Sequence, residues 1–135
     1  MNVPITLTYA SIFALFALVL SFRAGTFRGK AGASILYGEP LNTELAERVR
    51  VHQNFLEYVP MILIVMGALE ANGASSMFLY ICGDLLLVAR VAHAIGLKHD
   101  NMAHKGRFIG AAGTALITLV MACYGVWLGV RALVS

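Results

Sequence analysis

Residues 50–66 read RVHQNFLEYVPMILIVM, in which a polar stripe runs directly into an apolar segment. Positions i, i+4, i+7 and i+8 of this stretch share one helical face, and they carry Arg50, Asn54, Glu57 and Tyr58. A charged group at membrane depth costs about 2.5–3.5 kcal/mol on insertion scales, which favours a position facing the bundle interior or a polar cavity. The stripe therefore predicts a ligand site on a membrane helix.

The composition extends the membrane assignment to the whole chain. Of its 135 residues, 59% are hydrophobic and 13% are charged, and the mean hydropathy is +0.78. Soluble domains use about 25% charged residues, so most of this surface is expected to lie outside water. Four stretches are long enough to cross about 30 Å of hydrocarbon, namely residues 2–22, 44–70, 75–97 and 108–130. We predict one all-α domain over residues 1–135, an integral membrane bundle of four helices.

The basic residues predict the orientation of this bundle. Nine of the ten Lys and Arg residues lie around the first and third connections, whereas the second connection, residues 70–76, has none. The positive-inside rule places the first and third connections in the cytoplasm. The net charge of +3 then reflects topology and attraction to anionic membrane lipid, and it requires no nucleic-acid partner. No Lys or Arg precedes the first apolar segment, so we expect a retained helix and not a secretory signal.

Glycine and proline mark the expected helix ends. Residues 25–43 contain four glycines and one proline, which predicts a loop. Asn42 or Thr43 is expected to cap the second helix, and Gly73 and Gly96 are expected C-caps. Two pairs of small residues predict close helix approach in lipid: Gly106 with Gly110, and Gly125 with Gly129.

Further polar residues lie on the third and fourth segments. Arg90 and His93 are three residues apart and share a helical face, and Arg107 precedes the fourth apolar segment. Two interpretations stay open: such side chains snorkel to lipid headgroups, or they line a cavity opposite the stripe of the second helix. Asp84 lies about half a turn around from His93, so we expect it to pair with a cation or a polar group of a neighbouring helix or subunit. The four histidines show no metal-ligand spacing, and no metal site is predicted.

These residues together resemble a known family, the membrane-associated proteins in eicosanoid and glutathione metabolism (MAPEG), which includes the microsomal glutathione transferases. The resemblance covers essentially the whole chain and implies a homotrimer of four-helix protomers, with glutathione bound between neighbouring subunits near the cytoplasmic face. Two departures, Leu97 where several members have tyrosine and Phe108 where prostaglandin E synthase has serine, favour a small relative of the bacterial kind. We therefore expect a multi-pass protein of the bacterial inner membrane.

The resemblance also implies a role for each matching residue. The second-helix residues that match the glutathione-holding positions are Arg50, Asn54, Glu57 and Tyr58, and Arg90 and His93 match polar positions on the third helix. Arg107 matches the arginine credited with holding the glutathione thiolate, helped by Tyr58 or His93. Arg23 or Arg28, near the end of the first helix, supplies a further cation.

The chemistry of the residues agrees with this expectation. Glutathione carries two carboxylates, one ammonium and one thiol. Guanidinium groups bind carboxylates through charge-assisted bonds, Glu57 suits the ammonium, and a guanidinium in a partly dry site favours the thiolate over the thiol. The leading hypothesis is a transferase that conjugates glutathione to hydrophobic electrophiles, with hydroperoxide reduction as a further activity. Two alternatives stay open: a non-catalytic lipid- or ligand-binding protein on the same scaffold, and a small cation transporter that uses Asp84 or Glu57.

Overall fold

A computed structural model of the chain describes residues 2–35, 37–101 and 103–134. It contains four helices: α1 Pro4–Lys30, α2 Thr43–Ala71, α3 Ser76–Gly96 and α4 Lys105–Val134. Each helix is long and apolar enough to cross a membrane, and the described residues form no strand. The predicted all-α architecture of four membrane helices is confirmed.

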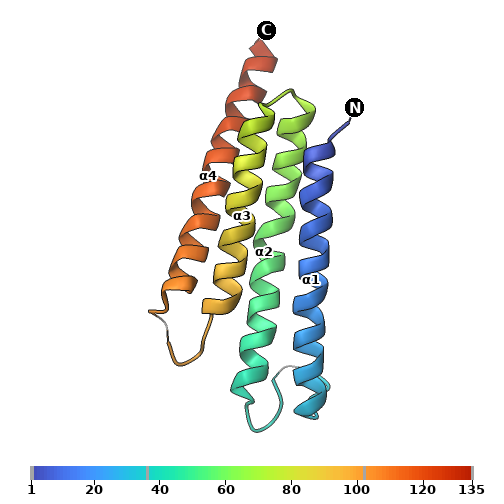
Figure 1. Cartoon of the computed structure of the whole chain (residues 1–135), viewed down its shortest axis with the longest axis vertical. Helices are drawn as coiled ribbons and strands as arrows, with labels where there is room; N and C mark the ends of the chain where they lie inside the picture. Colours follow the sequence, from blue (N-terminus) through green and yellow to red (C-terminus); the bar gives the residue numbers. More distant parts are fainter. Residues whose placement is uncertain (1, 36, 102, 135) are drawn as a thin grey trace.

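The four helices run side by side along the long axis of the molecule (Figure 1). α3 packs most extensively against α4, and α1 packs most extensively against α2. The two chain ends and the short α2–α3 turn lie at one end of the bundle, and the two longer connections lie at the other end (Figure 1). The basic connections therefore share one end, which we call the cytoplasmic end after the positive-inside rule.

The helix ends follow most of the expected signals. Asn42 caps α2, because its side chain accepts a hydrogen bond from the backbone N–H of Leu45 at 2.9 Å. The C-cap of α2 is Asn72 and not the predicted Gly73, which follows it at a φ of 77°. The predicted loop begins too early, since α1 continues to Lys30. Cations in the last turn suit the helix dipole, and Lys30 lies over the Phe27 ring at 5.1 Å.

Gly96 has a different role from the predicted C-cap. It is the last residue of α3 and lies where α3 meets the first turn of α4. A Cβ at Gly96 would collide with the backbone of Gly106 and Arg107, and a Cβ at Gly110 would collide with His93. These glycines therefore let α3 and α4 approach closely, as small residues do between membrane helices.

The second predicted glycine pair makes no close helix contact among the described residues. The nearest atom to a Cβ built on Gly125 lies at 3.9 Å, and a Cβ on Gly129 would meet nothing within 4 Å. At this end α3 and α4 pack instead through the rings of Phe78 and Tyr124, whose centroids lie 5.1 Å apart.

Glu70 ties the opposite end of the bundle together. Its carboxylate accepts hydrogen bonds from the backbone N–H groups of Ile5 at 2.8 Å and Thr6 at 2.7 Å. No side chain of α1 caps its own first turn, so Glu70 of α2 satisfies N–H groups that a helix start leaves unpaired. The anion also suits the positive end of the α1 dipole.

Candidate functional site

A polar pocket of about 430 Å³ lies at the cytoplasmic end, between α2, α3, the α3–α4 connection and the start of α4. Four of the predicted site residues line it: Arg50, Asn54, His93 and Arg107. They come from three helices and are separated by up to 57 positions in the sequence. The fold thus brings together residues that the sequence placed only on separate segments.

Arg50 forms an ion pair along the outer face of α2. Its Nη1 lies 2.6 Å from Glu57 Oε1 and its Nη2 lies 3.3 Å from Glu57 Oε2. The two side chains are 50% and 46% exposed in the single chain, and Tyr58 beside them is 46% exposed. Glu57 and Tyr58 do not line the pocket. They lie further along the same helix, on a surface that the described residues leave about half exposed.

Arg90 lies inside the bundle and does not line the pocket. It is 2% exposed, donates to Asn54 Oδ1 at 2.7 Å and to Thr114 Oγ1 at 3.3 Å, and lies over the Phe55 ring at 5.7 Å. Among the described residues, no carboxylate lies within ion-pair distance of Arg90. Because Asn54 accepts from Arg90 through its oxygen, its amide N–H groups are left to donate into the pocket. Arg90 therefore orients a pocket residue.

His93 and Arg107 are placed by the close approach of α3 and α4. His93 is 4% exposed, and its Nδ1 has no hydrogen-bond partner. Its Cβ packs on Gly110, one turn after Arg107 in α4. A larger residue at Gly110 would separate the helices and pull these two side chains apart.

The two first-helix arginines lie away from this pocket in the single chain. Arg23 lines a separate cavity of about 10 Å³ together with Arg48 and Val51. Arg28 lies in the last turn of α1. Neither is among the pocket residues, so their predicted contribution to a site shared with a second subunit stays a prediction.

Three ionisable pocket residues were not among the predicted site residues. Glu47, Lys98 and His99 line the pocket, and the Glu47 carboxylate accepts from the backbone N–H of His99 at 2.8 Å. The spacing carried a signal for Glu47, which precedes Arg50 by three positions and so shares its helical face. Lys98 and His99 lie in the connection between α3 and α4, and helical periodicity cannot predict where the side chains of a connection lie.

The same group includes candidate metal-ligand atoms. Glu47, His99 and Asp100 each offer one such atom, and these atoms all lie within 4.8 Å of one another. The Lys98 ammonium, however, lies 3.5 Å from the Glu47 carboxylate. Because a cation already balances this carboxylate, we assign no metal to the group.

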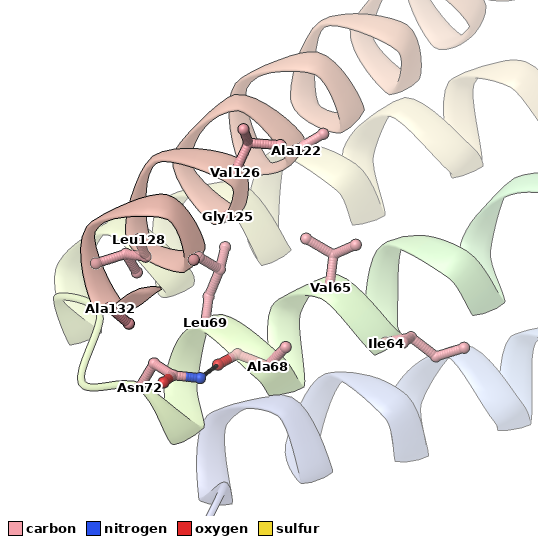
Figure 2. Close-up of a pocket in the computed structure, with 11 residues that line it drawn as sticks. Ile64, Val65, Ala68, Leu69, Asn72, Ala122, Gly125, Val126, Leu128 and Ala132 are labelled. Carbon is pink, nitrogen blue, oxygen red and sulfur yellow. Dashed lines mark hydrogen bonds between the residues drawn. The ribbon is translucent and has the colours of Figure 1, made fainter. Parts of the chain in front are cut away.

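A second hollow, of about 460 Å³, lies between α2 and α4 toward the other end of the bundle. Figure 2 shows Val65 and Leu69 of α2 facing α4, which contributes Ala122 and Val126. No ionisable side chain lines this groove. It is therefore an apolar, lipid-depth surface and offers no group for acid–base or anion chemistry.

Asp84 pairs with a neighbouring helix, as expected. The Tyr9 hydroxyl of α1 donates to Asp84 Oδ1 at 2.6 Å. The Tyr9 ring lies against Gly83, where a Cβ would collide with it. Neither residue lines the polar pocket.

The arrangement of the pocket suits an anionic ligand. Three cations line it, namely Arg50, Lys98 and Arg107, against one carboxylate, Glu47, which is already hydrogen-bonded to His99. Guanidinium and ammonium groups bind carboxylates and stabilise thiolates.

Comparisons with known proteins identify the family of this chain. The model of the MAPEG family matches residues 6–127. The chain is 32% identical over 114 residues to the "Inner membrane protein YecN" of Escherichia coli strain K12, covering 84% of this chain and 86% of the relative. The protein of the same name from Escherichia coli O6:H1 matches equally well. No solved structure matches the chain significantly. The polar pocket, the four membrane helices and these matches lead to one conclusion: the chain belongs to the MAPEG family.

Proposed function

We propose that this protein is a glutathione transferase of the membrane, which conjugates glutathione to hydrophobic electrophiles at the cytoplasmic end of the bundle. The observation that carries the proposal is the convergence of Arg50, Asn54, His93 and Arg107 on one pocket of about 430 Å³. Small-molecule sites typically measure about 300–1,000 Å³. Membership of a family that includes glutathione transferases supports the choice of ligand.

The pocket residues, together with Glu57 on the adjoining outer face of α2, match glutathione group by group. Arg50 offers a guanidinium to a carboxylate, the Asn54 amide donates to a peptide carbonyl, and Glu57 accepts the ammonium. Glu57 is already paired with Arg50 at 2.6 Å, so an incoming ligand exchanges one ion pair for two. Charge-assisted bonds of this kind are stronger than those between neutral groups.

Arg107 is the residue we assign to the thiol. A free thiol has a pKa near 8.5, so only a few per cent is thiolate at pH 7. A guanidinium within contact distance favours the anion. The thiolate sulfur then attacks the electrophilic carbon, a carbon–sulfur bond forms, and the leaving group departs with the bonding electron pair. Tyr58 or His93 assists by donating a hydrogen bond to the anion.

A homotrimer would complete the site. The Arg50–Glu57 pair and Tyr58 occupy the outer face of a membrane helix and are about half exposed in the single chain. Charged groups at this depth are costly unless protein or water covers them. A neighbouring protomer would cover this face and bring a first-helix arginine, Arg23 or Arg28, toward the ligand.

The inner membrane is the proposed location. The relatives carry the name "Inner membrane protein YecN", and the chain itself has four helices able to cross a membrane. A membrane position also gives hydrophobic electrophiles a route to the thiolate through lipid.

The decisive experiment compares two arginines of α4 in detergent-purified protein. Arg107→Ala should retain glutathione binding in isothermal titration, yet lose the thiolate absorbance and most turnover of a reactive aryl halide. Arg131→Ala removes an arginine at the opposite end of the same helix, where it lies over Trp127, and should change neither. Unchanged turnover in Arg107→Ala would remove Arg107 from the chemistry. Absence of glutathione binding in the wild type would favour a non-catalytic binding protein instead.

A further inference from the structure

The α3–α4 connection contributes a charged wall to the polar pocket. Lys98 and His99 line this pocket together with Glu47 of α2. They follow directly after α3, which ends at Gly96. The wall is thus built from a helix and a connection that are about 50 residues apart in the sequence.

Glu47 holds this wall in place. Its side chain is 6% exposed, and its Oε1 accepts from the His99 backbone N–H at 2.8 Å and lies 2.6 Å from His99 Nδ1. Its Oε2 lies 3.5 Å from Lys98 Nζ. Both oxygens therefore bind the connection, and the buried carboxylate fixes it against α2.

Lys98 retains capacity for a ligand. An ammonium has three N–H donors, and the contact with Glu47 is a long one at 3.5 Å. The Lys98 side chain is 39% exposed, and it borders the pocket that also contains Arg50 and Arg107. Its remaining donors can therefore reach an anion in that pocket.

We infer that Lys98 binds the glycine carboxylate of glutathione, and that Glu47 is the residue that positions it. This inference rests on the proposed function. Glu57 is the acceptor for the ammonium at the γ-glutamyl end, so the glycine end points the other way along α2. Glu47 precedes Glu57 by ten residues, which corresponds to about 15 Å along the helix. A tripeptide spans at most about 11 Å, so the proposal requires the side chains of Glu57 and Lys98 to reach across the remaining distance of about 4 Å.

The inference makes Lys98 a specificity residue for one carboxylate. The probes are glutathione and its glycyl monoethyl ester, in which that carboxylate is masked. The wild-type protein should bind glutathione about fivefold more tightly than the ester, the equivalent of one modest ion pair. In Lys98→Met the two dissociation constants should become equal through a loss confined to glutathione, and Lys98→Arg should restore the preference.

Two further variants serve as tests. The first shows whether Lys98 acts by direct contact with the carboxylate or only by its long-range charge, and the second tests whether Glu47 positions Lys98. Lys105→Met removes an exposed lysine at the same end of the bundle that does not line the pocket, and it should keep the fivefold preference. Glu47→Gln keeps the shape and the acceptor oxygen but removes the charge that holds Lys98, so it should lower the preference to less than about twofold. Adding Lys98→Met to Glu47→Gln should then change little, because the two residues act together.

Each outcome has a definite meaning. An unchanged preference for glutathione over the ester in Lys98→Met overturns the inference while the transferase proposal stands. Equal weakening of both ligands, or the same effect from Lys105→Met, overturns it as well, since the charge would then act at long range. If the wild type binds neither probe, the proposed function fails and this inference fails with it.

Discussion

Replacing Asn54 with alanine should leave the buried guanidinium of Arg90 without one of its hydrogen-bond acceptors. Arg90 is 2% exposed, and its bond to Asn54 Oδ1, at 2.7 Å, is the shorter of its two side-chain bonds, with Thr114 at 3.3 Å. A hydrogen bond to a charged group contributes about 1.5–3 kcal/mol. Thr114 and the Phe55 ring still contact the guanidinium after the substitution. We therefore expect Asn54→Ala to lower the free energy of unfolding by about 2–3 kcal/mol.

A second substitution shows whether Asn54→Ala destabilises the protein because a buried charge loses its partner or because the smaller side chain leaves a cavity. Asn54→Ala combined with Arg90→Met removes the charge together with its partner. Buried ion groups are costly without partners, so the double variant should be more stable than Asn54→Ala alone, by about 1–2 kcal/mol. The assay is unfolding by SDS in detergent micelles, followed by circular dichroism.

The matched control is Asn72→Ala, an exposed asparagine at the end of the same helix whose side chain donates to the Ala68 carbonyl. It should cost less than about 1 kcal/mol. A double variant no more stable than Asn54→Ala would refute the assignment of Asn54 as the partner of a buried charge.

Two further substitutions test the packing that supports the site. Gly110→Ala places a Cβ against the backbone and Cβ of His93, so it should destabilise the protein by about 1–3 kcal/mol and weaken glutathione binding. Gly129→Ala, with nothing within 4 Å of its Cβ, should be neutral or stabilising, and equal effects at the two glycines would contradict the packing argument. Glu70→Ala removes the acceptor for two N–H groups of α1. It should cost about 1 kcal/mol, as loss of a helix cap does, and speed hydrogen exchange in the first turn of α1; unchanged exchange there would argue against the cap.

The sequence was most informative where the signal was local. Helical spacing placed Arg50, Asn54, Glu57 and Tyr58 on one face, and the structure shows them on α2 with Arg50 and Asn54 in the pocket. The cap at Asn42 followed from residue type in the same way. The end of α1 was misplaced, because glycines inside residues 25–30 do not break a helix whose other residues favour it.

The sequence could not separate the roles of Arg90 and His93. Three positions along a helix correspond to about 300° of rotation, or 60° around the axis, so both residues seemed to share one face. In the structure His93 lines the pocket, whereas Arg90 turns into the bundle and orients Asn54. The contact of α3 with Gly110 of α4 fixes the rotation of α3 that separates them.

The composition and the helical spacing of the polar residues alone therefore determined that this chain forms four membrane helices with a polar stripe on the second. Both signals lie within a single segment, because burial in lipid depends on the hydrophobicity of that segment and the stripe depends on helical geometry. Tertiary structure decided the rest. Which polar side chains meet, and that Glu47 recruits Lys98 and His99 to the same pocket, depend on how helices rotate against one another and where a connection folds back. The helix rotations and the path of the connection are determined by contacts between residues far apart in the chain, which no local sequence pattern encodes.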